Sequence, residues 1–463
     1  MKYVGIITLA VILFGCNAKQ AQHNKKPNII IVFTDDQGYQ DLGCYGSPKI
    51  KTPNIDQMAS EGLRYTNFYV ASSVCSASRA ALLTGKLPKN NGVPGVFWPD
   101  QKGMDSSNVT IAEVLKKERY RTACFGKWHL GDQTGTLPIH QGFDEYYGIP
   151  YSNDMRIGVS HKFADNVKFN EGYTLEQAKA DQLLVLEDKK AGKQPWKQGK
   201  SNFVPLFEGD KIVEYPAEQS SLTKRYFNKA IEFIKQSDDE PFFIYLTPAM
   251  PHIPLFASEQ FSGKSERGLY GDVIEEIDYH MGQLLNHLKT SGLDKNTLVI
   301  YASDNGPWLD MKKAGGSAEP LRGGKFSNYE GGVRVPGIFW FPGQIKENIV
   351  SNHIARTIDL LPTIASLVQS DVTELGIDGT ILPEIVGQDN AYKETNLYSK
   401  GKEVCGIRVG DWKYMATSGK KWAKKEDGPE LFNLKDDVGE ENNLHESNPE
   451  KVEELKKLLE EHK

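Results

Sequence analysis

The stretch Asn28-Ile29-Ile30-Ile31-Val32-Phe33-Thr34-Asp35-Asp36 decides the fold class of this chain. Between its polar ends runs an unbroken series of β-branched and aromatic residues, with no alternation of polar and apolar side chains. Such a series is typical of a central parallel strand that is covered on both faces. We therefore expect a strand inside an α/β sheet, with Asp35 and Asp36 just beyond its carboxyl end.

Three later apolar runs also end in polar residues. They are 121–125 before 126–129, 242–246 before 247–252, and 297–301 before 303–306. Open α/β sheets place their ligand sites beyond the carboxyl ends of the strands. The polar residues after each run are therefore candidates for one functional site.

Helical patterns lie between the strand-like runs, at 54–60, 110–117, 222–234 and 273–288. In the last of these, apolar residues recur at helical spacing. The alternation of strand and helix patterns predicts a doubly wound α/β domain, with a large mixed, mostly parallel sheet sandwiched by helices.

The alternation of strand and helix patterns is interrupted at two places. Residues 154–220 are rich in Lys, Glu, Gln and Gly and predict a solvated insertion. After a helix at 357–367, short strand patterns and a final helix at 449–461 predict a smaller α+β subdomain with an antiparallel sheet. We expect a large domain over 27–370 and a C-terminal subdomain over 371–463.

The N-terminus has the features of an export signal. One cation, Lys2, precedes an apolar stretch that is shorter than the roughly 20 residues needed to span a membrane. Leu13-Phe14-Gly15-Cys16 resembles a bacterial lipobox, although Phe14 is bulkier than that pattern prefers. The resemblance implies a signal peptide over 1–15, lipidation of Cys16 and a polar tether over 16–26. An uncut anchor and a plain secretory signal are the alternatives.

The composition is that of a soluble globular protein. Of 463 residues, 39% are hydrophobic and 25% charged, which excludes a disordered chain and a multi-span membrane protein. The net charge of −6 gives no reason to expect a nucleic-acid partner. We expect an exported bacterial lipoprotein, periplasmic or attached to the outer membrane, that meets the membrane only through its lipid anchor.

The segment Val74-Cys75-Ser76-Ala77-Ser78-Arg79-Ala80-Ala81-Leu82-Leu83-Thr84-Gly85-Lys86 is the most informative stretch for function. It predicts a cysteine just before a short helix that Gly85 ends, with Arg79 one turn away on the same face. A lone cysteine in such a place is usually a buried core residue. The amides of a helix N-terminus, however, also favour an anion.

This segment resembles the signature of the formylglycine-dependent sulfatases, which belong to the alkaline phosphatase superfamily. The matching residues are Cys75, Ala77, Ser78, Arg79, Leu82, Thr84 and Gly85. Ala77 replaces the commoner proline, and Lys86 stands where arginine is frequent. The resemblance implies an alkaline-phosphatase-like fold and the oxidation of Cys75 to Cα-formylglycine by a maturation enzyme.

The resemblance also bears on two pairs of polar residues that could bind a metal ion. Asp35, Asp36, Asp304 and Asn305 carry the oxygen donors that a hard cation such as Ca²⁺ prefers. A single pair of such residues is more often a turn or a helix cap. Because both pairs match metal-site motifs of the sulfatases, the resemblance implies a calcium site that the hydrated aldehyde at Cys75 completes.

The resemblance further includes two lysines and two histidines. Gly126-Lys127-Trp128-His129-Leu130-Gly131 matches the second sulfatase signature, and His252 and Lys325 occupy further family positions. The resemblance implies that Lys127 and His129 orient the formylglycine hydrate, which attacks sulfur. It further implies that His252, with Lys325, protonates the leaving oxygen, and that His129 takes a proton before sulfate leaves.

Residues 142–154 look most like the branch that contains arylsulfatase A and N-acetylgalactosamine-6-sulfatase. The resemblance implies a sulfated carbohydrate substrate from a host or algal glycan. Two alternatives stay open: a phosphonate or phosphate monoester hydrolase of the same superfamily, and a lipoprotein that binds sulfated glycans without cleaving them. Of the other cysteines, Cys124 is expected in the core, while Cys44 and Cys405 have no assigned role.

Overall fold

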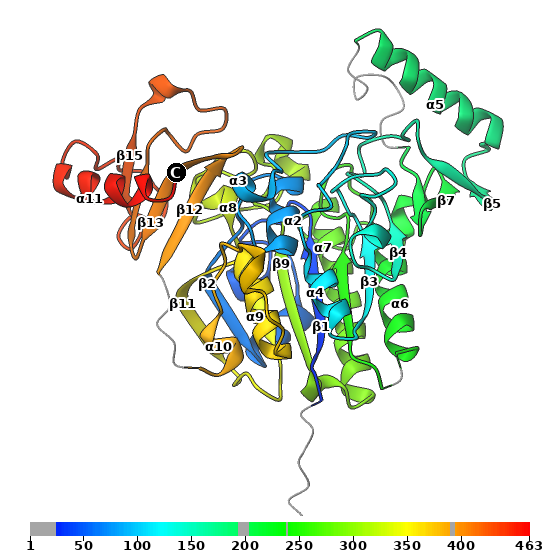
Figure 1. Cartoon of the computed structure of the whole chain (residues 1–463), viewed down its shortest axis with the longest axis horizontal. Coiled ribbons are helices and arrows are strands. Elements are labelled where there is room, and N and C mark those ends of the chain that lie inside the picture. The colour runs from blue at the N-terminus through cyan, green and yellow to red at the C-terminus, as the bar shows by residue number, and fades with distance from the viewer. Residues whose placement is uncertain (1–24, 193–202, 238, 389–393) are drawn as a thin grey trace, which may run out of the picture.

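The computed structural model describes residues 25–192, 203–237, 239–388 and 394–463 (Figure 1). The expected signal peptide and the lipidation of Cys16 lie outside the described residues. Among the helices described, none has both the length and the apolar character that crossing a bilayer requires.

An eleven-stranded mixed sheet forms the large part of the molecule, in the order β11-β2-β10-β9-β1-β8-β3-β4-β6-β7-β5. Its central strands β9, β1, β8, β3 and β4 are all parallel to their neighbours in this group. The bounds are β1 (Asn28–Thr34), β2 (Leu63–Tyr69), β3 (Arg121–Gly126), β4 (Glu145–Gly148), β8 (Phe242–Thr247), β9 (Thr297–Ser303), β10 (Arg334–Trp340) and β11 (Ile349–Arg356). The predicted fold class is confirmed.

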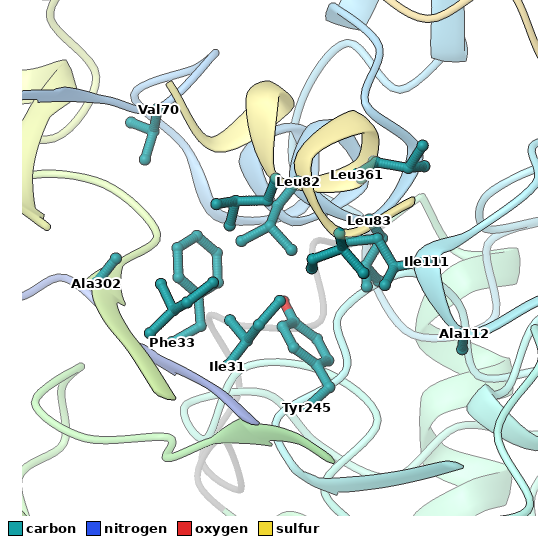
Figure 2. Close-up of a cluster of buried hydrophobic side chains, with 14 of the residues drawn as sticks. Ile31, Phe33, Val70, Leu82, Leu83, Ile111, Ala112, Tyr245, Ala302 and Leu361 are labelled. Atoms are coloured by element: carbon teal, nitrogen blue, oxygen red, sulfur yellow. The ribbon is translucent and has the colours of Figure 1, made fainter. Parts of the chain in front are cut away.

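Helices cover both faces of this sheet. Alternate residues of β1 point to opposite faces, and because both sets are apolar, both faces must be covered. Ile31 and Phe33 pack with Leu82 and Leu83 of α2 in one core cluster, which Figure 2 shows together with Leu361 of α9. Ile30 and Val32 belong to the opposite cluster, with α6 and α7. The helices are α1 (Pro53–Ser60), α2 (Cys75–Thr84), α3 (Pro88–Asn91), α4 (Ile111–Lys117), α6 (Leu222–Lys235), α7 (Leu269–Thr290), α8 (Glu330–Val333), α9 (Leu360–Val368) and α10 (Pro383–Val386).

The segment 154–220 differs from its prediction as a solvated insertion. It contributes β5 (Lys162–Phe169), β6 (Leu206–Glu208) and β7 (Lys211–Tyr215), which extend one end of the large sheet. Only α5 (Leu175–Lys190) projects away from the body of the molecule (Figure 1). The polar composition misled the prediction because β5 is half-exposed and carries charged side chains on its open side.

The C-terminal part forms the predicted antiparallel sheet. Its strands are β12 (Thr395–Lys400), β13 (Glu403–Val409), β14 (Trp412–Met415) and β15 (Glu430–Asn433), and α11 (Pro449–Glu460) packs against it.

A buried charge network joins the small sheet to the large one. Glu330 of α8 accepts hydrogen bonds from Lys413 of β14 (3.1 Å) and from Tyr398 of β12 (2.7 Å). Lys413 also pairs with Glu440 at 2.6 Å. Burial alone would raise the pKa of Glu330, but Lys413 and Arg408 lower it to about 2. The two parts are therefore held together by ionic groups whose partners come from both.

Candidate functional site

The carboxyl ends of β1, β9, β3 and β8 meet at one edge of the sheet, together with the first residue of α2. One ligand atom from each of Asp35, Asp36, Cys75 and Asp304 lies within 4.8 Å of the others. All four residues are at least 97% buried. The structure therefore brings together side chains that lie up to 269 positions apart in the chain.

The loops after β1 and β9 are tied to each other, which positions their acidic side chains. The Asp304 amide donates to the carbonyl of Thr34 (3.0 Å), and the Asp36 amide donates to Asp304 Oδ1 (3.1 Å). Asp36 adopts a left-handed backbone conformation with φ of 62°. Because an L-residue with a side chain rarely adopts this conformation, the turn indicates a functional requirement at this position.

The donor set suits a hard divalent cation. Asn305 Nδ2 donates to Asp36 Oδ1 (2.7 Å), whereas Asn305 Oδ1 is buried and has no hydrogen-bond partner. An unpaired buried amide oxygen beside three carboxylates is costly unless a cation accepts its lone pairs. The residues present therefore fit calcium.

The carboxylates affect one another. Burial, and then the neighbouring Asp35, raise the pKa of Asp304 to about 6, although Arg79 opposes the rise. Burial would also raise the pKa of Asp35, but Lys127 and His252 hold it well below its usual value. Positive charge is therefore what keeps this cluster ionised.

Cys75 is the first residue of α2 and faces the acidic cluster. Its Sγ lies 3.5 Å from Asp35 Oδ1 and 3.9 Å from Asp36 Oδ1. Burial, and then the Asp304 carboxylate, raise the pKa of the Cys75 thiol well above its usual value. These surroundings disfavour a thiolate, so an unmodified cysteine would be a weak nucleophile here.

Arg79 lies one turn further along α2 and is completely buried. Its Nε donates to Asp304 Oδ2 (2.9 Å), and its Nη1 donates to the carbonyl of Lys127 (2.9 Å). Because the guanidinium contacts the loops after β9 and β3 at once, we describe Arg79 as a positioning residue.

Two lysines reach the cluster from opposite sides. Lys127 Nζ donates to Asp35 Oδ2 (2.6 Å), and Lys325 Nζ donates to Asp36 Oδ2 (2.8 Å). Both are buried. They place positive charge beside the carboxylates, where the oxygens of a bound anion would also need it.

The tautomers of the two histidines follow from their contacts. His252 Nδ1 faces two acceptors, Asn153 Oδ1 (3.2 Å) and the carbonyl of Ile253 (2.5 Å), so Nδ1 carries the hydrogen. This leaves His252 Nε2 turned toward Asp36 Oδ2, at 3.6 Å.

His129 shows the reverse arrangement. Its Nε2 donates to the carbonyl of Phe97 (3.0 Å), and its buried Nδ1 has no partner. Burial, and then the Lys127 cation, lower the pKa of His129 well below its usual value. His129 is therefore a neutral imidazole with a free lone pair. Like Asp36, it has a positive φ, of 61°.

Two further residues of the site were missed by the sequence analysis. Ser152 Oγ lies 3.2 Å from Lys127 Nζ and 3.3 Å from His252 Nε2, and Asn153 holds the other nitrogen of His252. Both follow β4, a strand too short and too tyrosine-rich to be recognised as a central strand. Searching for polar residues after this fifth parallel strand would have found them.

The other cysteines within the described residues, Cys44, Cys124 and Cys405, are free thiols. Cys124 lies in β3 and is completely buried, as expected for a core residue. Cys44 and Cys405 do not form a disulfide.

Comparison with known proteins gives consistent matches. A family model described as Sulfatase matches residues 27–370. Human arylsulfatase A is 38% identical over 401 residues, covering 84% of this chain and 74% of the relative. The N-acetylgalactosamine-6-O-sulfatase of Bacteroides thetaiotaomicron is 33% identical, covering 97% of this chain and 96% of the relative.

A solved structure resembles almost the whole chain. It is Ps i-CgsB in complex with k-i-k-neocarrahexaose, with a TM-score of 0.73 and 29% identity over 94% of this chain and 92% of that one.

Proposed function

The chain belongs to the sulfatase family and is a sulfuric ester hydrolase, and from this premise we propose that it desulfates a glycan by means of a formylglycine at Cys75 and a calcium ion. The observation that carries the proposal is the buried cluster of Cys75 with three carboxylates and two lysines. A formylglycine at this position would account for a cysteine whose surroundings disfavour a thiolate lying beside three carboxylates.

The proposed formylglycine answers a chemical need. A hydrated aldehyde has two hydroxyls on one carbon, so one can attack sulfur and the other can release the sulfate again. A maturation enzyme would supply the oxidation of Cys75 before the chain folds, because Cys75 is 99% buried in the folded chain.

The proposed calcium site uses Asp35, Asp36, Asp304, the free Oδ1 of Asn305 and the side chain at position 75. When bound, the ion would supply positive charge that polarises a sulfate oxygen and acidifies the hydroxyl beside it. Arg79 holds Asp304 in place through its Oδ2.

The remaining polar residues have separate roles in this proposal. Lys127 and Lys325 neutralise the oxygens of the transferring sulfuryl group. In its imidazolium form, His252 donates the Nε2 proton to the leaving oxygen and becomes neutral, while its Nδ1 hydrogen stays bonded to Asn153 Oδ1 and the carbonyl of Ile253. His129 accepts a proton at Nδ1, the nitrogen without a partner.

The substrate class follows from the relatives. One relative is named N-acetylgalactosamine-6-O-sulfatase, and a structural relative was solved in complex with k-i-k-neocarrahexaose. We infer that this chain acts on a sulfated carbohydrate, outside the cytoplasm, with the large domain of 27–370 as its catalytic domain. Export as a lipoprotein through Cys16 is part of the proposal.

The test is co-expression with a formylglycine-forming maturation enzyme. The purified protein should release sulfate from 4-nitrophenyl sulfate or N-acetylgalactosamine 6-sulfate, and mass spectrometry should show an aldehyde at position 75. Cys75→Ala should lose turnover, whereas the matched control Cys44→Ala should keep it. An active enzyme with an unmodified thiol at position 75 would contradict the formylglycine mechanism. Turnover of phosphonate esters alone would favour the alternative hydrolase.

A further inference from the structure

A cavity of roughly 390 Å³ lies between the two sheets, beside the site but outside its acidic cluster. Its wall includes Ser73 and Val74, which directly precede Cys75, and Phe326, which directly follows Lys325. The opposite wall comes from the C-terminal part, including Ser399 and Trp422. Neither part of the molecule could form this cavity alone.

A run of aromatic rings connects the site to the cavity. The His252 ring lies 5.9 Å from Trp308, Trp308 lies 5.5 Å from Phe326, and Phe326 stacks on Trp422 at 5.3 Å with 25° between the planes. The run therefore leads from the expected proton donor to the molecular surface.

Trp422 is the most exposed of the large apolar side chains described, with 69% of its surface accessible. Its backbone has a positive φ of 58°, which a tryptophan rarely adopts. The exposed indole and the strained backbone of Trp422 both cost stability, because burying the indole would stabilise the fold. We take this cost as an indication of a binding role.

Cations lie around the cavity. Lys400 and Lys420 belong to its wall, and Lys421 lies 5.0 Å from the centre of the Phe326 ring. Lys420 pairs with Asp427 and Lys421 with Asp310. An exposed aromatic face beside these cations suits a sugar ring with an apolar C–H face, within an anionic chain.

We propose that this cavity binds the sugar next to the sulfated one, so that the enzyme recognises an oligosaccharide rather than a single sulfated sugar. The proposal rests on the proposed function, since it extends the same site. Trp422 stacks on the sugar ring, and Phe326 supports the indole from its other side.

The test compares substrates that differ only in length. The matured enzyme is assayed on N-acetylgalactosamine 6-sulfate and on 6-sulfated chondroitin tetrasaccharide, and in parallel on sulfated carrageenan oligosaccharides and their sulfated monosaccharides. We expect the ratio of kcat/KM, oligosaccharide over monosaccharide, to fall at least about tenfold in Trp422→Ala, mainly through KM. Trp422→Phe should restore most of it.

Tyr279→Ala is the matched control, since Tyr279 is also an exposed aromatic residue but lies on α7, outside the cavity. It should keep the wild-type ratio. If monosaccharide sulfates are cleaved but the oligosaccharides are not, or the ratio is unchanged in Trp422→Ala, the sugar subsite is overturned while the proposed function stands. If no sulfate ester of any length is cleaved, the proposed function itself fails.

Discussion

At the scale of single residues, hydrogen-bond partners assign opposite roles to the two histidines of the site. His252 has its Nδ1 hydrogen held by acceptors, and His129 has its Nε2 hydrogen held by the carbonyl of Phe97. One nitrogen of each ring therefore remains available, turned toward the acidic cluster for His252 and without a partner for His129.

The role of His252 predicts an effect that depends on the leaving group. A sugar alkoxide leaves poorly without a proton, whereas 4-nitrophenolate leaves well by itself. His252→Ala should therefore lower kcat by about 10²–10⁴ on a sugar sulfate and by far less on 4-nitrophenyl sulfate. The measurement is steady-state kinetics on both substrates, with His287→Ala of α7 as the control. Equal losses on both substrates would contradict the proton-donor role.

The carboxylate cluster predicts a response to calcium. An ion that binds only the folded chain stabilises it, by about 2.7 kcal/mol at a concentration of 100 Kd. Adding Ca²⁺ to the chelator-treated protein should therefore raise Tm, and the rise should be smaller in Asn305→Ala, which lacks the free Oδ1. Thermal unfolding followed by circular dichroism tests this. A wild-type Tm that ignores both Ca²⁺ and chelator would contradict the metal site.

At the scale of elements, α2 positions the proposed nucleophile, Cys75. Cys75 and Arg79 lie near its start, and its apolar side chains pack against β1 (Figure 2). Gly85 ends α2 in a left-handed conformation, with φ of 65°. A Cβ there would lie 3.2 Å from side chains of Ile377 and Leu361. The helix is therefore fixed at both ends, by the site and by the core.

This packing predicts different outcomes for two similar glycines. Gly92 ends α3 with φ of 78° and has open space around it. Gly92→Ala should lower the free energy of unfolding by about 1–2 kcal/mol through backbone strain alone. Gly85→Ala should cost about 1–3 kcal/mol more, because the added methyl group is overpacked. Urea unfolding measures the free energy of unfolding of both variants. Equal decreases in the two variants would contradict overpacking at Gly85.

At the scale of the whole molecule, the charge network around Glu330 decides how the two sheets are joined. Glu440 is its second carboxylate, completely buried beside Lys413. Burial raises the pKa of Glu440 to about 7, and the neighbouring Glu330 adds to the rise while Lys413 opposes it. The cavity with Trp422 lies at the same junction, so the network also holds that wall in place.

The raised pKa predicts a pH dependence of stability. The unfolded chain has an ordinary glutamate, so the folded state holds the extra proton between about pH 4.5 and 7. The stabilisation from this proton is complete below pH 4.5 and is lost as the pH rises through 7. The free energy of unfolding of the wild type should therefore fall by an amount of order 1–3 kcal/mol over that range, and Glu440→Gln should not show this fall.

The measurement is urea unfolding at pH 5, 6, 7 and 8 for the wild type, Glu440→Gln and the exposed neighbour Glu441→Gln. Glu441→Gln should keep the wild-type slope. The same slope in all three proteins would contradict a raised pKa at Glu440.

Local patterns in the sequence were sufficient for much of the fold and of the site. The apolar runs of β1, β3, β8 and β9 and the helices between them were predicted within a few residues, because strand and helix periodicities are properties of neighbouring residues. The polar residues after those strands were expected at one edge because parallel strands end together, and the structure brings them into one cluster.

Other features arise only from contacts between distant parts of the chain. Ser152 and Asn153 joined the site through a strand with no recognisable pattern, and 154–220 extended the sheet despite its polar composition. The cavity beside Trp422 and the network around Glu330 each combine residues from both parts of the molecule. The sequence by itself thus predicted most of the side chains that the structure brings into one cluster. Only the packing of the two sheets decided what surrounds them, because loop positions depend on burial and pairing across hundreds of residues rather than on local propensity.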